Sequence, residues 1–222
     1  RNMYWLTVIF TIIVATYNCL ETDALSIQRG NAYIDKLISE EIGYKFDPYL
    51  LDDVSKGFVK KIVYVNVTGE AKLHNGLIYG LNTIHRASDC SLTEKDGRLN
   101  VSAVLGAGLI AMRYEGTVRF MNYGPKIDIN GIIHYVEVLM DFSVNATSGL
   151  DGELHRFAIT ELNNVQVWIS GLGPLNWMIN PMLKMANKVF RGKVHSLLEG
   201  KVESHIRERL PKFQFPVEEK TK

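Results

Sequence analysis

The fold is decided by the last long apolar stretch of the chain, residues 175–210, which read LNWMINPMLKMANKVFRGKVHSLLEGKVESHIRERL. Apolar residues recur there every three or four positions, which is the spacing of one face of a helix. The stretch therefore predicts a helix of about 36 residues, roughly 50 Å long. In its second half the steps become four, so the apolar stripe drifts around the helix by about 40° per step. A helix that lies in a curved, twisted sheet needs such a drift.

The sequence before this helix alternates between apolar and polar residues, which predicts β-strands with one buried face. Turn residues such as Gly69, Asp96-Gly97 and Asn130-Gly131 separate the strands. Short connections favour an antiparallel arrangement, and strands this long suit a sheet that wraps around something. The expected strands are Phe58–Thr68, Glu70–Arg86, Gly97–Met112, Tyr114–Met121, Ile132–Asn145 and Gly152–Trp168.

A shorter amphipathic helix is expected from Asn31 to Ile42, before Gly43. The expected fold class is α+β: a long curved antiparallel sheet wrapped around the long C-terminal helix and a short N-terminal helix. Gly192 and Gly200 lie inside the long helix, where each costs about 1 kcal/mol relative to alanine. A close backbone approach, a bend and a tolerated imperfection are the alternative reasons for them.

The first 24 residues are expected to be a secretory signal peptide. Tyr4 to Ala15 is apolar but shorter than the roughly 20 residues that span a bilayer. Cleavage is expected near Ala24, and a retained membrane anchor is the alternative. One domain over residues 25–210 and a flexible tail over residues 211–222 complete the expected organisation. The expected location is secreted and extracellular, without stable insertion into a membrane.

Charge and residue spacing argue against a nucleic-acid-binding protein and against a metalloprotein. The net charge is only +1, whereas a nucleic-acid binder needs a basic face for phosphates, so we expect no nucleic-acid partner. The histidines show no ligand spacing with cysteine or with each other, so neither a metal nor another cofactor is expected. Cys19 would leave with the signal peptide. Cys90 is expected to be a quiet, partly buried thiol, with pairing between chains as the alternative.

Three tripeptides fit the acceptor pattern for N-glycosylation: Asn66-Val67-Thr68, Asn100-Val101-Ser102 and Asn145-Ala146-Thr147. In each expected strand the asparagine lies opposite the apolar face. Random placement on a period of two would give this agreement about one time in eight. We therefore expect a glycoprotein, glycosylated at Asn66, Asn100 and Asn145.

Methionine and aromatic side chains indicate a candidate ligand site, because they form an adaptable apolar wall. One strand supplies small residues such as Ala103, Gly106 and Ala107, so either the helix approaches it closely or a cavity remains. Plain core packing is the alternative for each apolar residue. The residues expected to bind the ligand are Leu105, Leu109, Val136, Val138, Met140, Trp168, Met178, Met182 and Met185.

Several short segments carry a resemblance to a known family. They are GEAKLHNGLIYGL at 69–81, Asp96-Gly97-Arg98-Leu99, GLGPL at 171–175 continued by Asn180-Pro181-Met182, and Phe46-Asp47-Pro48. Together they resemble the group 7 mite allergens, over roughly Asn31 to Leu210.

The resemblance implies a TULIP fold, which is one half of the bactericidal/permeability-increasing protein architecture: a super-roll of sheet around helices. It also implies a lipid or another hydrophobic small molecule as the partner, bacterial lipids among them, and an arthropod source. It supplies no counterpart for Cys90 or the three sequons. The related takeout group matches less well, because its N-terminal cysteine pair is missing here.

No catalytic constellation stands out, so we do not expect an enzyme. Ser170-Gly171 lacks the preceding glycine of a nucleophile elbow, and Glu40-Glu41 is expected to be a solvated surface pair. His134 is expected in the core. Two functions remain open. A secreted, non-catalytic binder of lipid or another apolar ligand predicts a hollow interior, whereas a protein-interaction or immune-modulating module predicts a filled core and an exposed apolar patch.

Overall fold

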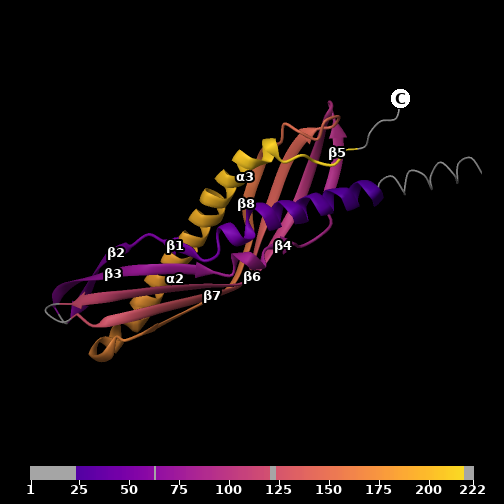
Figure 1. Ribbon diagram of the computed structural model, residues 1–222. Helices are drawn as coiled ribbons and strands as arrows, with labels where there is room; N and C mark the ends of the chain where they lie inside the picture. The colour runs from indigo at the N-terminus through magenta and orange to yellow at the C-terminus, as the bar shows by residue number, and fades with distance from the viewer. Residues whose placement is uncertain (1–23, 63, 121–123, 218–222) are drawn as a thin grey trace, which may run out of the picture.

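The computed structural model describes residues 24–62, 64–120 and 124–217 (Figure 1). Its eight strands form one antiparallel sheet in the order β1-β3-β6-β7-β8, with β2 paired to β3 and with β4 and β5 paired to β6. The strands are β1 (Tyr49–Leu51), β2 (Val54–Ile62), β3 (Val65–Tyr79), β4 (His85–Arg86), β5 (Ser91–Lys95), β6 (Arg98–Phe120), β7 (Lys126–Asn145) and β8 (Glu153–Ser170). The expected signal peptide and Cys19 lie outside the described residues.

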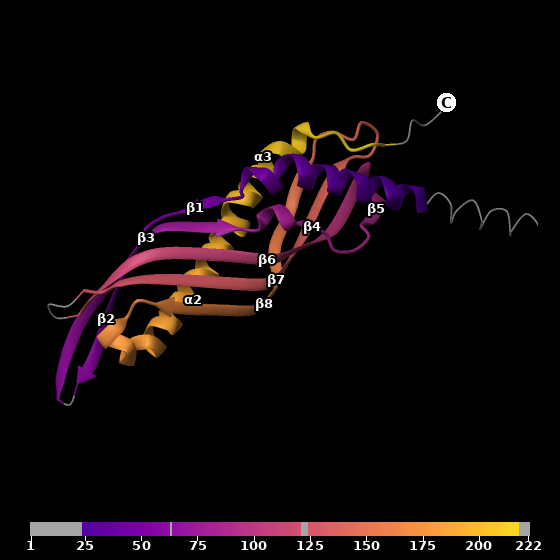
Figure 2. The same cartoon turned by 60° about the horizontal axis from the view of Figure 1, so that its bottom comes forward.

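Two helices pack on this sheet (Figures 1 and 2). In the described residues the N-terminal helix covers 24–41, so it includes the seven residues before the predicted start. The C-terminal helix and its flanking turns comprise η3 (Gly173–Met178), α2 (Ile179–His195), η4 (Ser196–Val202), α3 (Glu203–Arg209) and η5 (Leu210–Lys212); the shorter turns η1 (Gly43–Lys45) and η2 (Leu81–Thr83) lie earlier. The predicted fold class is confirmed. No helix in the described part of the chain is both long enough and apolar enough to cross a membrane.

Several predicted strand boundaries are wrong, and the turns predicted at Gly69 and Asn130-Gly131 lie inside β3 and β7. The predicted strand Phe58–Thr68 is a hairpin, in which Ile62 at the end of β2 pairs with Val65 at the start of β3. The sequence between them contains neither glycine nor proline, so it carries no turn signal. Conversely, β6 runs unbroken through the predicted gap at Arg113. Arg113 lies there as an exposed outer-face residue of a continuous strand.

All three long strands are interrupted along one line that crosses the sheet. The pairing between β6, β7 and β8 skips Leu109, His134 and Asn164. Leu109 and Asn164 have left-handed backbone angles, with φ of 56° and 49°. The sheet bends sharply here, as the turn in the long strands of Figure 2 shows.

The bend changes which residues face the core. In β6, Leu105 and Ala107 are buried before the bend, and Ile110 and Met112 are buried after it. Leu109 is therefore 61% exposed, and the prediction that it faces inward is wrong. The same shift exposes His134, which was also predicted to lie in the core. Because side chains alternate between the two faces of a strand, one skipped residue moves every following side chain to the other face.

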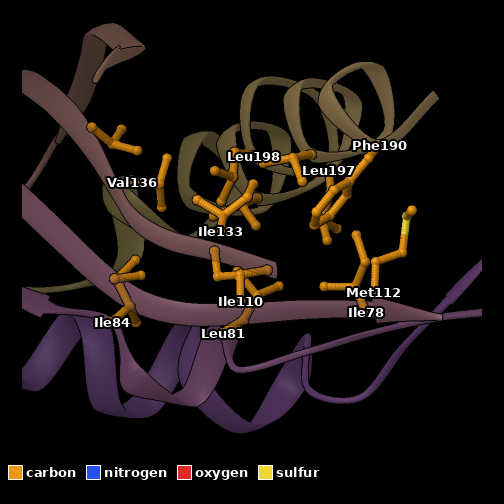
Figure 3. Close-up of a cluster of buried hydrophobic side chains, with 14 of the residues drawn as sticks. Ile78, Leu81, Ile84, Ile110, Met112, Ile133, Val136, Phe190, Leu197 and Leu198 are labelled. Atoms are coloured by element: carbon orange, nitrogen blue, oxygen red, sulfur yellow. The ribbon is translucent and has the colours of Figure 1, made fainter. Parts of the chain in front are cut away.

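Buried side chains of both helices and the sheet form one continuous cluster. Figure 3 shows part of it, with Phe190, Leu197 and Leu198 pointing from the long helix towards Ile110 and Ile133 of the sheet. Leu197 and Leu198 are consecutive but both buried, because η4 is π-helical and its wider turns bring both towards the sheet.

Neither helix glycine is explained by a close backbone approach. A Cβ added at Gly192 or at Gly200 would meet no atom within 4 Å, so this explanation is wrong. Gly200 lies within the π-helical turns of η4. Gly131 of β7 does make such an approach, since a Cβ there would lie 2.6 Å from the ring of Phe190.

The chain after Pro211 is packed rather than loose as far as residue 217. Phe215 is 2% exposed, and its N–H donates to the carbonyl oxygen of Gly149 at 2.8 Å. The hydroxyl of Tyr33 donates to the carbonyl oxygen of Phe213 at 3.0 Å. The prediction of a flexible tail from Pro211 is therefore wrong for these residues, because two aromatic side chains anchor them to the N-terminal helix.

Leu109→Gly should stabilise the protein by about 1 kcal/mol, because glycine adopts left-handed angles without the steric cost that leucine bears. The free energy of unfolding in urea measures the effect. The matched variant Leu105→Gly, four residues earlier on the buried face, should lose at least about 3 kcal/mol. Similar losses in both variants would contradict the bend.

Candidate functional site

A groove of about 820 Å³ opens between the long helix and the first part of β2. It forms because α2 packs on β7 and β8, whereas β2 lies at the opposite edge of the sheet. Its volume falls within the range of about 300–1,000 Å³ that is usual for small-molecule sites. The lining residues are Asp53, Val54, Ser55, Lys56 and Gly57 from the β2 side, and Lys184, Met185, Lys188, Val189, Gly192, Lys193 and Ser196 from the helix and its C-cap.

The apolar part of the groove consists of Val54, Met185 and Val189. All three are half-buried and pack against the edge of the core. Met185 and Val189 lie one helical turn apart, and Gly192 continues their face of the helix. Because a Cβ at Gly192 would enter open space, the missing side chain leaves room in the groove.

Four lysines surround this apolar strip, against the single carboxylate of Asp53. The ammonium group of Lys193 donates to the backbone carbonyl of Asp52 at 3.2 Å and lies 3.8 Å from its carboxylate. It thus ties α2 to the start of β2. Among the described residues, Lys56, Lys184 and Lys188 form no ion pair.

The nine predicted ligand residues fall into three groups. Six are core residues at most 2% exposed: Leu105, Val136, Val138, Met140, Met178 and Met182. Leu109 and Trp168 lie on the outside, at 61% and 45% exposure. Trp168 faces outward because its neighbours Val167 and Ile169 take the inner face of β8. Met185 lines the groove.

The small residues of β6 distinguish a close approach from a cavity. Ala103 and Ala107 are 1% and 2% exposed, so the space above them is filled. A water-sized void beside them would leave their methyl groups accessible. Of the two alternatives left open by the sequence, close packing therefore applies along this part of the inner face. Ligand binding by the six core residues stays a prediction.

Sequence reasoning missed the lysines and Gly192. A usable signal was present, since α2 carries Lys184, Lys188, Arg191 and Lys193 and no acidic residue. Lys184, Lys188 and Gly192 also recur at steps of four, on one side of the helix.

A second polar cluster surrounds Glu41, whose side chain is 4% exposed. Its carboxylate accepts hydrogen bonds from Arg209 at 2.9 Å, His205 at 2.8 Å and Lys45 at 2.5 Å. Burial alone would raise the pKa of Glu41, but these three donors outweigh it and lower that pKa from 4.5 to about 2. The prediction that Glu41 is a solvated surface charge is wrong, because the residue fastens the N-terminal helix to α3. None of these side chains lines the groove.

Cys90 is buried, as expected, at 3% exposure. Its N–H donates to the side-chain oxygen of Asn31 at 2.9 Å, and burial raises the pKa of its thiol to about 11. In the part of the chain that the structure describes, no group of three or more His, Cys, Asp or Glu side chains could hold a metal ion.

The three sequon asparagines lie on the outer face of the sheet or at its end. Asn66 is exposed on β3. Asn100 is half-buried, and its side-chain nitrogen donates to the carbonyl oxygen of Thr93 at 3.3 Å. Asn145 ends β7, and its side-chain oxygen accepts the N–H groups of Thr147 and Ser148. Glycosylation of the three remains a prediction.

The sequence profile of the Group 7 allergen family matches residues 29–210. The chain belongs to this family. Mite allergen Lep d 7 of Lepidoglyphus destructor is 23% identical over 195 residues, which are 84% of this chain and 86% of that protein. Mite allergen Der p 7 of Dermatophagoides pteronyssinus is 21% identical over 196 residues, which are 83% and 88% of the two chains. The resemblance inferred from the sequence is thereby confirmed.

Two solved structures are also similar to this family member. A lipopolysaccharide binding protein matches with a TM-score of 0.45 and 17% identity over 85% of the chain, which spans 37% of that protein. Takeout 1 of Epiphyas postvittana matches with a TM-score of 0.42 and 13% identity, over 84% of this chain and 91% of that one.

Glu41→Gln should lower the free energy of unfolding by about 2–3 kcal/mol near neutral pH, because it removes the buried negative charge that three donors share. The folded-state pKa of Glu41 is depressed, so its contribution is complete above pH 4.5 and is lost as the pH falls towards 2. Urea unfolding of both proteins at pH 6 and pH 3 measures this. The neighbouring Glu40→Gln, at an exposed position, is the control; a difference between wild type and Glu41→Gln that does not shrink at pH 3 would contradict the assignment.

Cys90 should resist alkylation by iodoacetamide at pH 8 in the folded protein, because the thiolate is the reactive form and both burial and the raised pKa suppress it. Peptide mass spectrometry reads the modification at this residue directly. Labelling in denaturant should be at least about tenfold faster. Equal rates in the two conditions would contradict a buried thiol.

Proposed function

We propose that this protein is a secreted, non-catalytic binder of a lipid or a similar apolar molecule. The ligand lies in the groove between α2 and β2 and not between the helices and the sheet. The observation that carries the proposal is the apolar strip of Val54, Met185 and Val189 at an opening of about 820 Å³.

The dimensions of the groove suit an extended hydrocarbon chain. The lining residues of the helix run from Lys184 to Ser196, which corresponds to roughly 18 Å along the axis. Each Å² of apolar surface removed from water contributes about 25 cal/mol, so a chain laid along this strip gains affinity without a specific polar contact.

The make-up of the groove favours binding over catalysis. Among the described residues that line it there is neither a histidine nor a cysteine, and its two hydroxyl groups belong to Ser55 and Ser196. Ser55 is oriented towards Glu70, to which its hydroxyl donates at 2.7 Å. The proposed secretion rests on the short apolar segment from Tyr4 to Ala15.

An exposed apolar strip on the convex face supports a second candidate function, interaction with another protein. Leu50 pairs with Leu77, and Tyr79 pairs with Ala111, which pairs in turn with Ile132. All five side chains face away from the core, and Leu50 is 75% exposed. Contiguous apolar patches of this kind are typical of interaction surfaces.

Gly192→Leu should abolish uptake of the neutral fluorescent probe N-phenyl-1-naphthylamine, because the new side chain fills the groove. The substitution enters open space and favours the helix, so the free energy of unfolding should stay equal or rise by up to about 1 kcal/mol. Probe fluorescence during titration measures binding, and urea unfolding measures stability.

The matched control is Gly200→Leu, the other helix glycine whose Cβ would meet no atom but which does not line the groove. It should bind the probe like the wild type. Equal binding by all three proteins would place the ligand elsewhere. No binding by the wild type would overturn the proposal and leave the convex strip as the functional surface.

A further inference from the structure

We propose that the groove selects amphiphiles that carry an anionic headgroup, a carboxylate or a phosphate, and that Lys56, Lys184 and Lys188 bind this headgroup. The inference rests on the proposed function, because the apolar chain of the same molecule occupies the strip beside these lysines.

The charge of the groove differs from that of the whole molecule. The chain has a net charge of only +1, yet four lysines and one aspartate line the groove. Lys193 already bonds to Asp52, whereas the other three lysines have no carboxylate partner among the described residues. Unpartnered cations beside an apolar surface are complementary to a ligand that is apolar along its length and negative at one end.

The three lysines gather at one end of the groove. Lys193 contacts Asp52 at the start of β2, so β2 runs antiparallel to α2 along the groove. Lys56 is four residues beyond Asp52, or about 13 Å along a strand. Lys184 is nine residues before Lys193, which is about the same distance along a helix. Lys56 therefore lies across the groove from Lys184 and Lys188, which are one helical turn apart.

This placement separates the two ends of an amphiphile. Lysine stems can lie along the apolar strip while their ammonium groups stay in water and contact an anion from both banks. The apolar chain then extends towards Gly192, where the groove has no side chain. A cationic headgroup at the same end would be repelled.

Chain-matched ligands test the headgroup. Displacement of N-phenyl-1-naphthylamine should be measured with dodecanoate, dodecyl phosphate, dodecanol and dodecyltrimethylammonium, each ionic ligand below its critical micelle concentration and dodecanol below its solubility limit. At low salt the two anions should bind about tenfold more tightly than dodecanol, and the cation most weakly. The advantage of the anions should shrink as salt screens the lysines. Inorganic phosphate should not displace the probe.

Paired variants test the residues. Lys56→Gln with Lys188→Gln should raise the Kd for dodecanoate about five- to tenfold and change the Kd for dodecanol less than twofold. Lys95→Gln with Lys201→Gln removes the same charge at exposed positions that do not line the groove, and should leave both affinities unchanged.

The outcomes separate this inference from the proposed function. Equal affinities for dodecanoate and dodecanol, or equal losses in the two double variants, would overturn the headgroup assignment while Gly192→Leu still reports on the groove. Displacement by inorganic phosphate would also overturn it, since the site would then bind anions without a chain. Failure of every dodecyl ligand to bind would overturn the proposed function itself.

Discussion

The architecture depends on one steric constraint, the interruption of three adjacent strands at Leu109, His134 and Asn164. A sheet whose strands ran straight through this line could bury only one set of alternating side chains. Because all three strands skip a residue together, the pairing resumes in register while the inward face changes from one alternating set to the other. Gly80 fits against the same line: a Cβ there would come within 2.4 Å of the carbonyl oxygen of Leu109, and its N–H donates to Asp47. Two segments that carry the family resemblance therefore meet at the bend.

Both the long helix and the N-terminal helix pack on this one bent sheet. Their side chains fill the space between the helices and the sheet. The Glu41 cluster joins the two helices where α3 ends, so the helical layer is held as well as covered. Because the interior is filled, the space for a ligand lies at the edge of the sheet. There β2 stands beside α2, and Gly192 supplies no side chain to close the gap. The space for a ligand thus results from where the sheet stops and not from a loosely packed core.

Much of this could be predicted from periodicity, because helix and strand spacing are local properties. The apolar steps through Phe190, Val194 and Leu198 gave the long helix, and the alternation from Val136 to Val144 gave the inner face of β7 beyond the bend. The phase at Leu109 and His134 could not be predicted, since a one-residue skip leaves no mark in composition. The groove could not be predicted for a different reason. Met182 in the core and Met185 in the groove are equally apolar, so the sequence cannot distinguish their positions. The groove depends on the distance between segments that are more than 120 residues apart in the chain.

Strand β2 lies at an edge of the sheet. This strand pairs with β3 on one side only, so its other edge has backbone groups that are not bonded to a neighbouring strand of the sheet. Such an edge can recruit a strand from another molecule and begin aggregation, and lysines along it are a known protection. Lys56 and Lys61 are both exposed on β2. Their charge therefore opposes edge-to-edge association between copies of the protein.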